Sequence, residues 1–484
     1  MADCGKNKIE LTECASKLCD DMVWHCLGFD RGLCRLPLSG WSLAVWAPAR
    51  GLEMDYISTR GQDGPLGFEH ALLSGLARDG GLYLPLEWPR FSKAEIAAMK
   101  GLSYAELAGR IMAPFCDGEI SEAELTAMAT DAYAGFDVPA IAPLVKLNND
   151  IHILELFHGP TIAFKDYAMQ FLARAYDRAL AKQQKHVVIL GATSGDTGSA
   201  ALEAFQGRDA IDVFILFPDG RVSPVQQRQM TSVIADGAFA VSVKGDFDDC
   251  QAFVKTLFND HQFRDQVGLS AVNSINWARL MPQIVYYFSS ALALGAPDQK
   301  VAFSVPTGNF GNVFAGYAAV QMGLPVERLI VASNQNDILP RFFEAGTMAR
   351  ETVVPSLSPS MDIQVSSNFE RLLFELLGRD GAKTAAVMQD FAASGHFTLD
   401  AVVMERACAL FSAYRLDDAG TVAEIATTAK NDGMVLDPHS AVGLSASRRA
   451  HADGTVPKDV PIISLACAHP AKFESAVETA TGQK

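Results

Sequence analysis

From residue 151 onward, short apolar runs alternate with stretches of helical periodicity, and this alternation is the strongest constraint on the fold. Runs of strand length cover Ile151–Phe157, His186–Leu190, Ile211–Phe217, Phe239–Val243, Val301–Val305, Leu329–Ala332 and Pro461–Leu465. The helical patterns between them include Ser199–Phe205, Asp248–Phe258, Trp277–Leu294, Val313–Met322 and Ile338–Ala345. This spacing predicts a mostly parallel α/β sheet, in which ligands gather at the carboxyl ends of the strands.

The regions before residue 151 differ in periodicity and composition. Residues 54–150 are mostly helical in pattern and predict a small N-terminal helical domain. Residues 1–53 hold five of the nine cysteines and three of the five tryptophans, and this composition stops abruptly at Met54. The five cysteines have no C-x-x-C pair and no zinc-like spacing. We therefore predict that residues 1–53 are a leader outside the fold, and we expect no metal site.

Composition excludes several classes of partner. The net charge of −16 argues against nucleic acid and anionic membranes as partners. No apolar run approaches the ~18 residues of a membrane span. The four cysteines beyond the leader are scattered through the chain, as is typical of reduced thiols in a cytoplasmic protein. A small-molecule substrate is the expected partner.

One lysine stands in an unusual place. Lys165 follows Ile162, Ala163 and Phe164, between an apolar strand broken at Gly159-Pro160 and the start of a helical pattern. Burial disfavours the charged ammonium, and a neutral lysine amine is a nucleophile that forms Schiff bases with carbonyl cofactors. A lysine whose stem covers apolar surface while its head reaches water is the alternative reading.

A glycine-rich turn follows the strand His186–Leu190. It runs Gly191-Ala192-Thr193-Ser194-Gly195-Asp196-Thr197-Gly198 and leads into a helix. Free N–H groups and the positive end of the helix dipole make such a turn an anion site. A dinucleotide fingerprint would need glycine where Thr193 stands, although Asp219 after the next strand could serve as the ribose-binding acid, so an NAD site stays open.

A second glycine turn has the same arrangement. Pro306-Thr307-Gly308-Asn309-Phe310-Gly311-Asn312 joins the strand Val301–Val305 to the helix Val313–Met322. A plain turn between strand and helix often contains glycine, so this loop alone is weak evidence. Two such loops and a lysine in an apolar turn suit a cofactor phosphate, a substrate carboxylate and a covalent anchor. These are the requirements of pyridoxal phosphate.

Six motifs in order give the chain a recognisable pattern. They are the lysine stretch around Lys165, Gly191–Gly198, Ser223–Met230, Asn273–Arg279, Pro306–Asn312 and Leu465–Phe473. From Met54 to the end, the chain resembles the threonine synthase family, in its longer form with an N-terminal domain. The resemblance implies an α/β fold of pyridoxal-phosphate fold type II, with two open, mostly parallel α/β subdomains forming the catalytic region 151–484. It also implies conversion of O-phospho-L-homoserine and water to L-threonine and phosphate.

The resemblance assigns roles to individual residues. Lys165 is the expected Schiff-base lysine and proton shuttle. The expected cofactor-binding residues are Gly308, Asn309, Phe310, Gly311 and Asn312, together with Cys467, which stands where the family usually has a threonine. The expected substrate-binding residues are Thr193, Ser194, Gly195, Asp196 and Thr197, with Ser274, Asn276 and Arg279 for the substrate phosphate. A monomer or homodimer is expected.

Two rival activities stay open at this point. A serine or threonine dehydratase of the same fold would carry the lysine and the phosphate loop, but would need no second basic site for a substrate phosphate. An NAD-dependent dehydrogenase would leave Lys165 without a role. A homologue that binds the cofactor without turnover is a third reading.

Overall fold

The computed structural model describes residues 54–147, 150–233, 235–245 and 247–483, without the side chain of residue 248. The predicted leader, residues 1–53, lies outside the described residues, so its placement stays a prediction. Among the helices of the described residues, none is long and apolar enough to cross a membrane.

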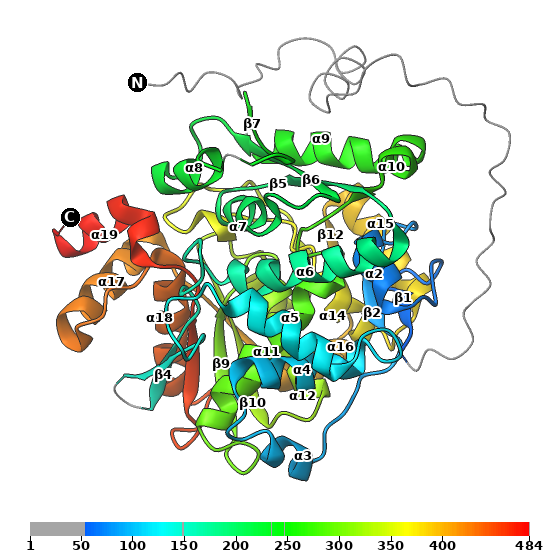
Figure 1. Cartoon of the computed structure of the whole chain (residues 1–484). Coiled ribbons are helices and arrows are strands. Elements are labelled where there is room, and N and C mark those ends of the chain that lie inside the picture. The colour runs from blue at the N-terminus through cyan, green and yellow to red at the C-terminus, as the bar shows by residue number, and fades with distance from the viewer. Residues whose placement is uncertain (1–53, 148–149, 234, 246, 484) are drawn as a thin grey trace, which may run out of the picture.

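A six-stranded sheet forms one half of the molecule (Figure 1). In spatial order its strands are β13 (Phe411–Arg415), β10 (Val326–Ser333), β9 (Val301–Pro306), β14 (Ile462–Ala466), β4 (Ile151–Glu155) and β3 (Leu144–Lys146). All neighbours run parallel except β3 and β4. The four central strands are apolar on both faces, since α18 (Pro438–Ala452) covers one face and the main core covers the other.

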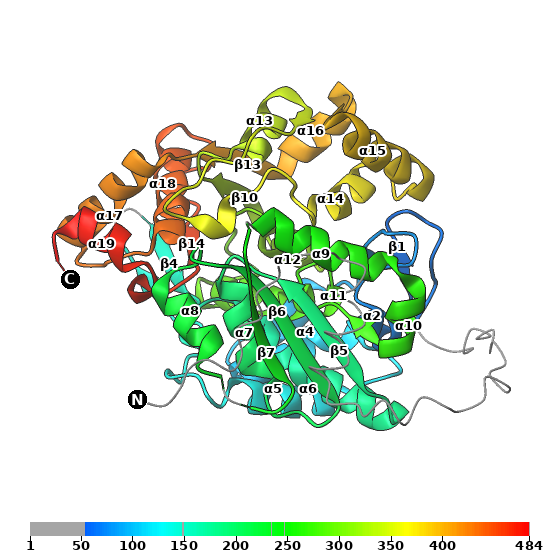
Figure 2. The ribbon, with the colours of Figure 1, turned by 90° about the horizontal axis from the view of Figure 1, so that it is seen from above.

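A four-stranded parallel sheet forms the other half. Its order is β7 (Ala238–Val243), β6 (Ile211–Pro218), β5 (Val187–Ala192) and β8 (Leu269–Ser270). Alternate residues of one strand face opposite layers, so Leu190 packs with α9 (Phe247–Asn259) and Ile189 with the main core that contains α6 (Lys165–Gln183). Figure 2 shows this sheet and its helices beside the larger half. The prediction of two open, mostly parallel α/β units is confirmed.

The N-terminal region is mainly helical, as predicted. It contains β1 (Tyr56–Ser58), α2 (Phe68–Ser74), β2 (Tyr83–Pro85), α3 (Lys93–Ala98), α4 (Tyr104–Met112), a 3-10 helix (Ala113–Phe115) and α5 (Glu122–Tyr133). The region shares one hydrophobic cluster with both larger halves. Within the predicted span 54–150, β3 pairs antiparallel with β4 and belongs to the six-stranded sheet.

A buried helix between β8 and β9 connects the two sheets along the chain. The helix α11 (Trp277–Ala293) packs against α4, α6 and α12 (Gly311–Gln321). Nearly all of its residues are buried, because neighbours cover it all around. The helix therefore carries its first turn into the interior between the two sheets.

The remaining helices pack around these elements. They are α8 (Pro224–Thr231), α10 (His261–Val267), α13 (Ile338–Ala345), α14 (Phe369–Leu376), α15 (Gly381–Ser394), α16 (Ala401–Leu410), α17 (Asp418–Asp432) and α19 (Glu474–Thr481), with 3-10 helices at Pro359–Met361 and Pro470–Phe473. A separate two-stranded antiparallel sheet pairs β11 (Thr347–Ala349) with β12 (His396–Thr398). The segment 365–435 is largely helical, but it also supplies the edge strand β13. That strand directly follows α16 and is mostly half-buried, so it carries no continuous apolar run.

Candidate active site

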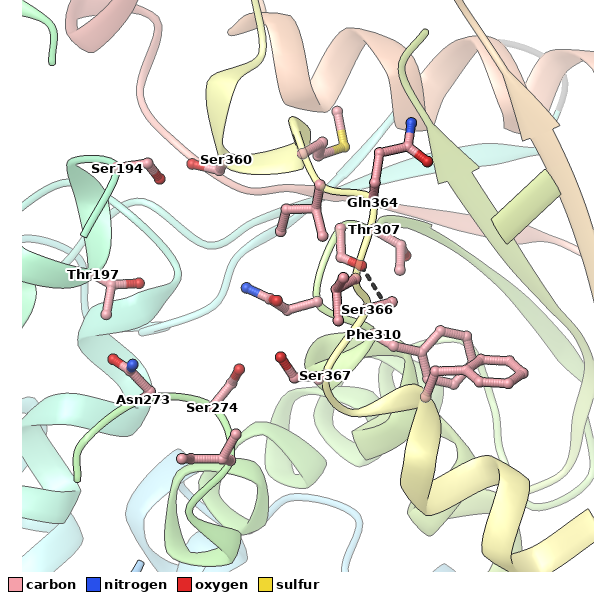
Figure 3. Close-up of a pocket in the computed structure, with 18 of the residues that line it drawn as sticks. Ser194, Thr197, Asn273, Ser274, Thr307, Phe310, Ser360, Gln364, Ser366 and Ser367 are labelled. Carbon is pink, nitrogen blue, oxygen red and sulfur yellow. Dashed lines mark hydrogen bonds between the residues drawn. The ribbon is translucent and has the colours of Figure 1, made fainter. Parts of the chain in front are cut away.

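A cavity of about 980 Å³ lies between the two halves and collects most of the predicted site residues. Its lining includes Lys165, four residues of the 193–197 loop and the whole 308–312 loop. Figure 3 shows Ser194 and Thr197 on one side, with Ser360, Ser366 and Thr307 across from them. Both glycine loops therefore open into one space, as the sequence predicted.

Lys165 is the first residue of α6, and only 12% of its side chain is exposed. Its ammonium nitrogen Nζ lies 4.3 Å from the centre of the Phe164 ring. The Asp196 carboxylate oxygen Oδ2 is 3.9 Å from Nζ, beyond hydrogen-bond distance. Burial lowers the pKa of Lys165, and the charge of Asp196 only partly offsets this effect. The side chain thus has the surroundings of a nucleophilic amine.

The turn before Lys165 is held by local hydrogen bonds. The Phe164 N–H donates to the carbonyl of Cys467, which ties the start of α6 to the end of β14. Asp166 is fully buried and accepts from the backbone N–H and the hydroxyl of Thr161 at 2.8 and 2.6 Å. Burial outweighs these bonds and raises the pKa of Asp166 to about 6. The lysine backbone is therefore fixed on both sides.

The 308–312 loop leaves its backbone donors available. Among the described residues, no acceptor lies within hydrogen-bond distance of the N–H groups of Gly308, Asn309 or Phe310. Phe310 has a φ of 63°, which turns the chain into α12. Gly308 packs so closely that a Cβ atom would lie 2.9 Å from the Ser360 carbonyl oxygen. The loop is a cradle of free N–H groups at a helix N-terminus, which suits a phosphate.

Asn312 adds a side-chain donor to the same cradle. Its Oδ1 accepts from the hydroxyls of Tyr286 and Tyr287 at 2.7 and 2.9 Å. Its Nδ2 is buried and has no hydrogen-bond partner. A buried amide donor without a partner is costly, so the site is built for a ligand that accepts a hydrogen bond.

The 193–197 loop is arranged differently. The Thr193 hydroxyl accepts from the N–H groups of Gly195 and Gly198 at 3.0 and 2.9 Å. Gly195 has a φ of 136°, and its Cα faces the side chain of Gln226 rather than the cavity. Ser194, Asp196 and Thr197 line the cavity. Gly195 therefore forms the turn, and its neighbours Ser194 and Asp196 are the residues that face the cavity.

Asp196 is the centre of a buried polar cluster that the sequence did not reveal. Its Oδ1 lies 2.8 Å from the Lys472 ammonium and accepts from Gln226 at 2.9 Å. Burial raises the pKa of Asp196, but Lys472 and Lys165 outweigh it and hold the pKa well below its usual range. Lys472 was recognised only as part of the sequence motif Leu465–Phe473. A lysine inside an otherwise apolar stretch was the available signal.

Arg279 and Asn276 differ in their surroundings. Arg279 lines the cavity, donates to the Val272 carbonyl at 2.8 Å and leaves its buried Nε without a partner. Burial lowers its pKa to about 10, so it stays charged at neutral pH. Asn276 is fully buried and does not line the cavity.

The side chain of Asn276 is used within the fold. Its Oδ1 caps α11 by accepting from the Ala278 N–H, and its amide donates to the carbonyls of Leu72 and Ala271. The structure thus uses the side chain of Asn276 as a helix cap, and its contact with the substrate phosphate stays a prediction. Ser274, its neighbour in the motif, lines the cavity as expected (Figure 3).

Cys467 lines the cavity at the end of β14. Its N–H donates to the Ser440 hydroxyl, and burial raises the pKa of its thiol, which stays protonated. His439 is another lining residue that sequence reasoning missed. Its Nδ1 donates to Asp437 at 2.8 Å, and its Nε2 accepts from the Ser360 N–H. These two bonds fix the neutral tautomer of the ring.

The acid needed for a dinucleotide site is not at the cavity. Asp219 accepts from the Ser242 hydroxyl at 2.9 Å and is not a lining residue. The lysine, the cradle of free donors and the orphaned Asn312 amide instead suit pyridoxal phosphate. Both the fold and the cavity define a pyridoxal-phosphate-dependent enzyme.

Comparisons with known proteins agree with this class and narrow it. Three family models match: threonine synthase N terminus at residues 55–133, pyridoxal-phosphate dependent enzyme at 136–410, and threonine synthase, C-terminal, at 440–484. Threonine synthase of Pseudomonas aeruginosa is 52% identical over 427 residues, 88% of this chain and 90% of the relative. The chain belongs to the threonine synthase family, and pyridoxal phosphate is its cofactor.

Solved structures of the family have the same fold. The crystal structure of pyridoxal-phosphate-bound threonine synthase from Brucella melitensis has a TM-score of 0.85 and 54% identity, covering 89% of this chain and 92% of that one. Yeast threonine synthase has a TM-score of 0.82 and 40% identity, covering 88% and 89%.

Proposed function

We propose that this protein is a threonine synthase, which converts O-phospho-L-homoserine and water to L-threonine and phosphate. The carrying observation is a buried lysine amine between a phosphate-sized cradle and a second basic group, Arg279, in one cavity. A dehydratase needs only the lysine and the cradle. The guanidinium with an orphaned buried Nε favours a substrate with a phosphate of its own.

Each residue has a proposed task. Lys165 holds the cofactor covalently, and the backbone N–H groups of Gly308 to Asn312 hold its phosphate. Ser194 and Thr197 receive the substrate carboxylate at the N-terminus of α7 (Asp196–Phe205). Ser274 and Arg279 bind the substrate phosphate. Cys467 faces the cofactor ring in place of the usual threonine.

The chemistry is divided between cofactor and chain. Bound pyridoxal phosphate supplies an electron sink that stabilises negative charge on substrate carbons. Lys165, once its amine is released, takes a proton from the α-carbon and returns it later. Arg279 orients the departing phosphate and stabilises its charge as the carbon–oxygen bond breaks. The burial that lowers the pKa of Lys165 lets one amine both accept and donate protons near neutral pH.

The test is product analysis with the purified chain and added cofactor. We expect equimolar phosphate and threonine from O-phospho-L-homoserine, and little keto acid from L-serine or L-threonine. Arg279→Lys keeps the charge but loses the forked donor set, and is expected to raise KM for the phosphorylated substrate by roughly tenfold. Keto acid as the main product, with no threonine, would instead establish a dehydratase. A cytoplasmic location and a monomer or homodimer stay predictions.

A further inference from the structure

Lys472 is a fully buried charged residue outside the proposed catalytic set. None of its side chain is exposed, and it lies in the 3-10 helix that follows β14. Its Nζ donates to the carbonyl of Thr161 at 2.8 Å and contacts Asp196 Oδ1 at 2.8 Å. A buried ammonium is retained only where its charge is compensated. The proposed reaction assigns Lys472 no task.

The Asp196 carboxylate is shared unequally between two lysines. Oδ1 takes Lys472 at 2.8 Å and the Gln226 amide at 2.9 Å. Oδ2 faces Lys165 at 3.9 Å and the Ser360 hydroxyl at 3.5 Å. Asp196 therefore forms its closer and more buried ion pair with Lys472, and only a longer contact with the reactive amine of Lys165.

This division has a consequence for Lys165. Attraction between charges falls with distance, and a carboxylate whose charge is already compensated attracts a second cation less. Without Lys472, Asp196 would form a one-to-one pair with Lys165 and hold it as an ammonium. An ammonium has no lone pair and cannot act as a nucleophile or a base.

We propose that Lys472 is a positioning residue that neutralises Asp196 and so keeps the Lys165 amine from being held as an ammonium. This proposal deepens the proposed function and rests on it, because the task of Lys165 comes from there. It also links the two halves: Asp196 belongs to α7 beside the four-stranded sheet, and Lys472 follows a strand of the six-stranded sheet.

Other charged groups act in the same direction as Lys472 or are unchanged by its removal. Arg279 on α11 and Lys472 both lower the pKa of Lys165, whereas Asp196 and Cys467 raise it. His439 on α18 is held as a neutral ring by its bonds to Asp437 and the Ser360 N–H, so it brings no charge to Asp196. All of these except Lys472 remain in the variants below that alter Lys472 alone, so the change of one charge is isolated.

The test measures the titration of Lys165 directly in the full-length chain before cofactor is added. The chain is labelled with acetic anhydride, and the labelling rate of Lys165 across pH is read by peptide mass spectrometry. Lys472→Gln keeps a donor for the Thr161 carbonyl but removes the charge. We expect its labelling midpoint to rise by about one pH unit. Lys472→Arg restores the charge and is expected to return the midpoint close to wild type. Lys383, with 69% of its side chain exposed, is the control in the same digest.

Two results would overturn the proposal. One is an unchanged midpoint in folded Lys472→Gln; the other is an equal shift in Lys472→Arg, which would indicate a packing effect alone. Asp196→Asn leaves no unpaired carboxylate, so it keeps the test decisive where Lys472→Gln does not fold. Its midpoint must fall below wild type, and a midpoint that stays or rises contradicts the proposal. In that background, adding Lys472→Gln should raise the midpoint by less than it does in the wild-type chain, because only the direct repulsion between the two ammonium groups is lost. Labelling needs no substrate, so a failed threonine synthase assay leaves this result readable.

Discussion

The two glycine loops are alike in sequence and different in structure. Each joins a parallel strand to a helix N-terminus at the cavity. In the 193–197 loop, the Thr193 hydroxyl occupies two backbone donors, and a carboxylate stands at the first helical position. In the 308–312 loop, the N–H groups of Gly308, Asn309 and Phe310 donate no hydrogen bond within the described residues, and the loop itself holds no charged side chain.

The difference indicates what each loop can bind. A phosphate needs many donors and is repelled by a nearby carboxylate, so the 308–312 loop suits the cofactor phosphate. The 193–197 loop offers hydroxyls and an acid already paired with Lys472, which suits a smaller group beside a reacting amine. A strand–glycine–helix pattern thus predicts a ligand site, while the side chains that occupy its donors decide which ligand.

The largest expected effect comes from the group between the loops. Lys165→Ala should lower turnover by roughly 10³-fold or more, because it removes the buried amine that acts as nucleophile and base. It should also remove the visible absorbance of the lysine-bound cofactor. Lys182→Ala on the same helix, where 59% of the side chain is exposed, is the matched control and should stay near wild type. Retained absorbance in Lys165→Ala would show that another residue anchors the cofactor.

A third helix, α6, also begins at the cavity with Lys165, and its second residue is an acid that can be compared with Asp196. Asp166 and Asp196 are both buried, but Asp166 has only neutral hydrogen-bond donors and its pKa is raised to about 6 from 3.8. The stability that this raised pKa provides is present below pH 4 and is lost as the pH rises through 6. Asp166→Asn removes that loss. Its gain in unfolding free energy over wild type should be about 2 kcal/mol larger at pH 8 than at pH 4.5.

Urea unfolding of wild type and Asp166→Asn at both pH values checks this. Asn can replace both contacts with Thr161, because its Oδ1 accepts from the N–H and its amide donates to the hydroxyl. A gain that does not depend on pH would mean that Asp166 is not the titrating group.

Within the 308–312 loop, the two glycines are expected to differ. A Cβ on Gly308 would lie 2.9 Å from the Ser360 carbonyl oxygen and 3.1 Å from the Met361 Cα. A Cβ on Gly311 would lie 3.3 Å from side-chain atoms of Asn368 and Ser274, which can shift. Gly308→Ala should therefore weaken cofactor affinity by roughly tenfold, and Gly311→Ala by much less. Fluorescence titration with pyridoxal phosphate measures both, and equal affinities would remove the distinction.

The sequence predicted those parts of the molecule that rest on local periodicity. The strands β4, β5, β6, β9 and β14 and the helix after each loop were found, because burial on both faces leaves continuous apolar runs. The edge strands β3 and β13 were missed, since they are only partly buried and carry no continuous apolar run. Lysine and loop residues were recognised from motif order. The Lys472–Asp196 pair joins residues from the two halves, and a single sequence carries no record of such contacts.

The smallest expected effect concerns the one departure from the family pattern. Cys467 lines the cavity, and burial keeps its thiol protonated, so it is a neutral group with weak hydrogen bonding. Threonine is close to it in size and is also neutral. Cys467→Thr should therefore change turnover by less than about threefold, in the direction of an increase.

Cys467→Asp replaces the neutral thiol at this position with a negatively charged carboxylate. A carboxylate here would stand near Lys165 and Asp196, where it competes with Asp196 for the same ammonium groups. If Cys467 also faces the cofactor ring, this charge alters the ring electronics and diverts part of the turnover. The measurement is threonine formed per phosphate released. The ratio should stay near one for wild type and Cys467→Thr and fall for Cys467→Asp. An Asp variant with the wild-type ratio would mean that position 467 does not influence the reacting group.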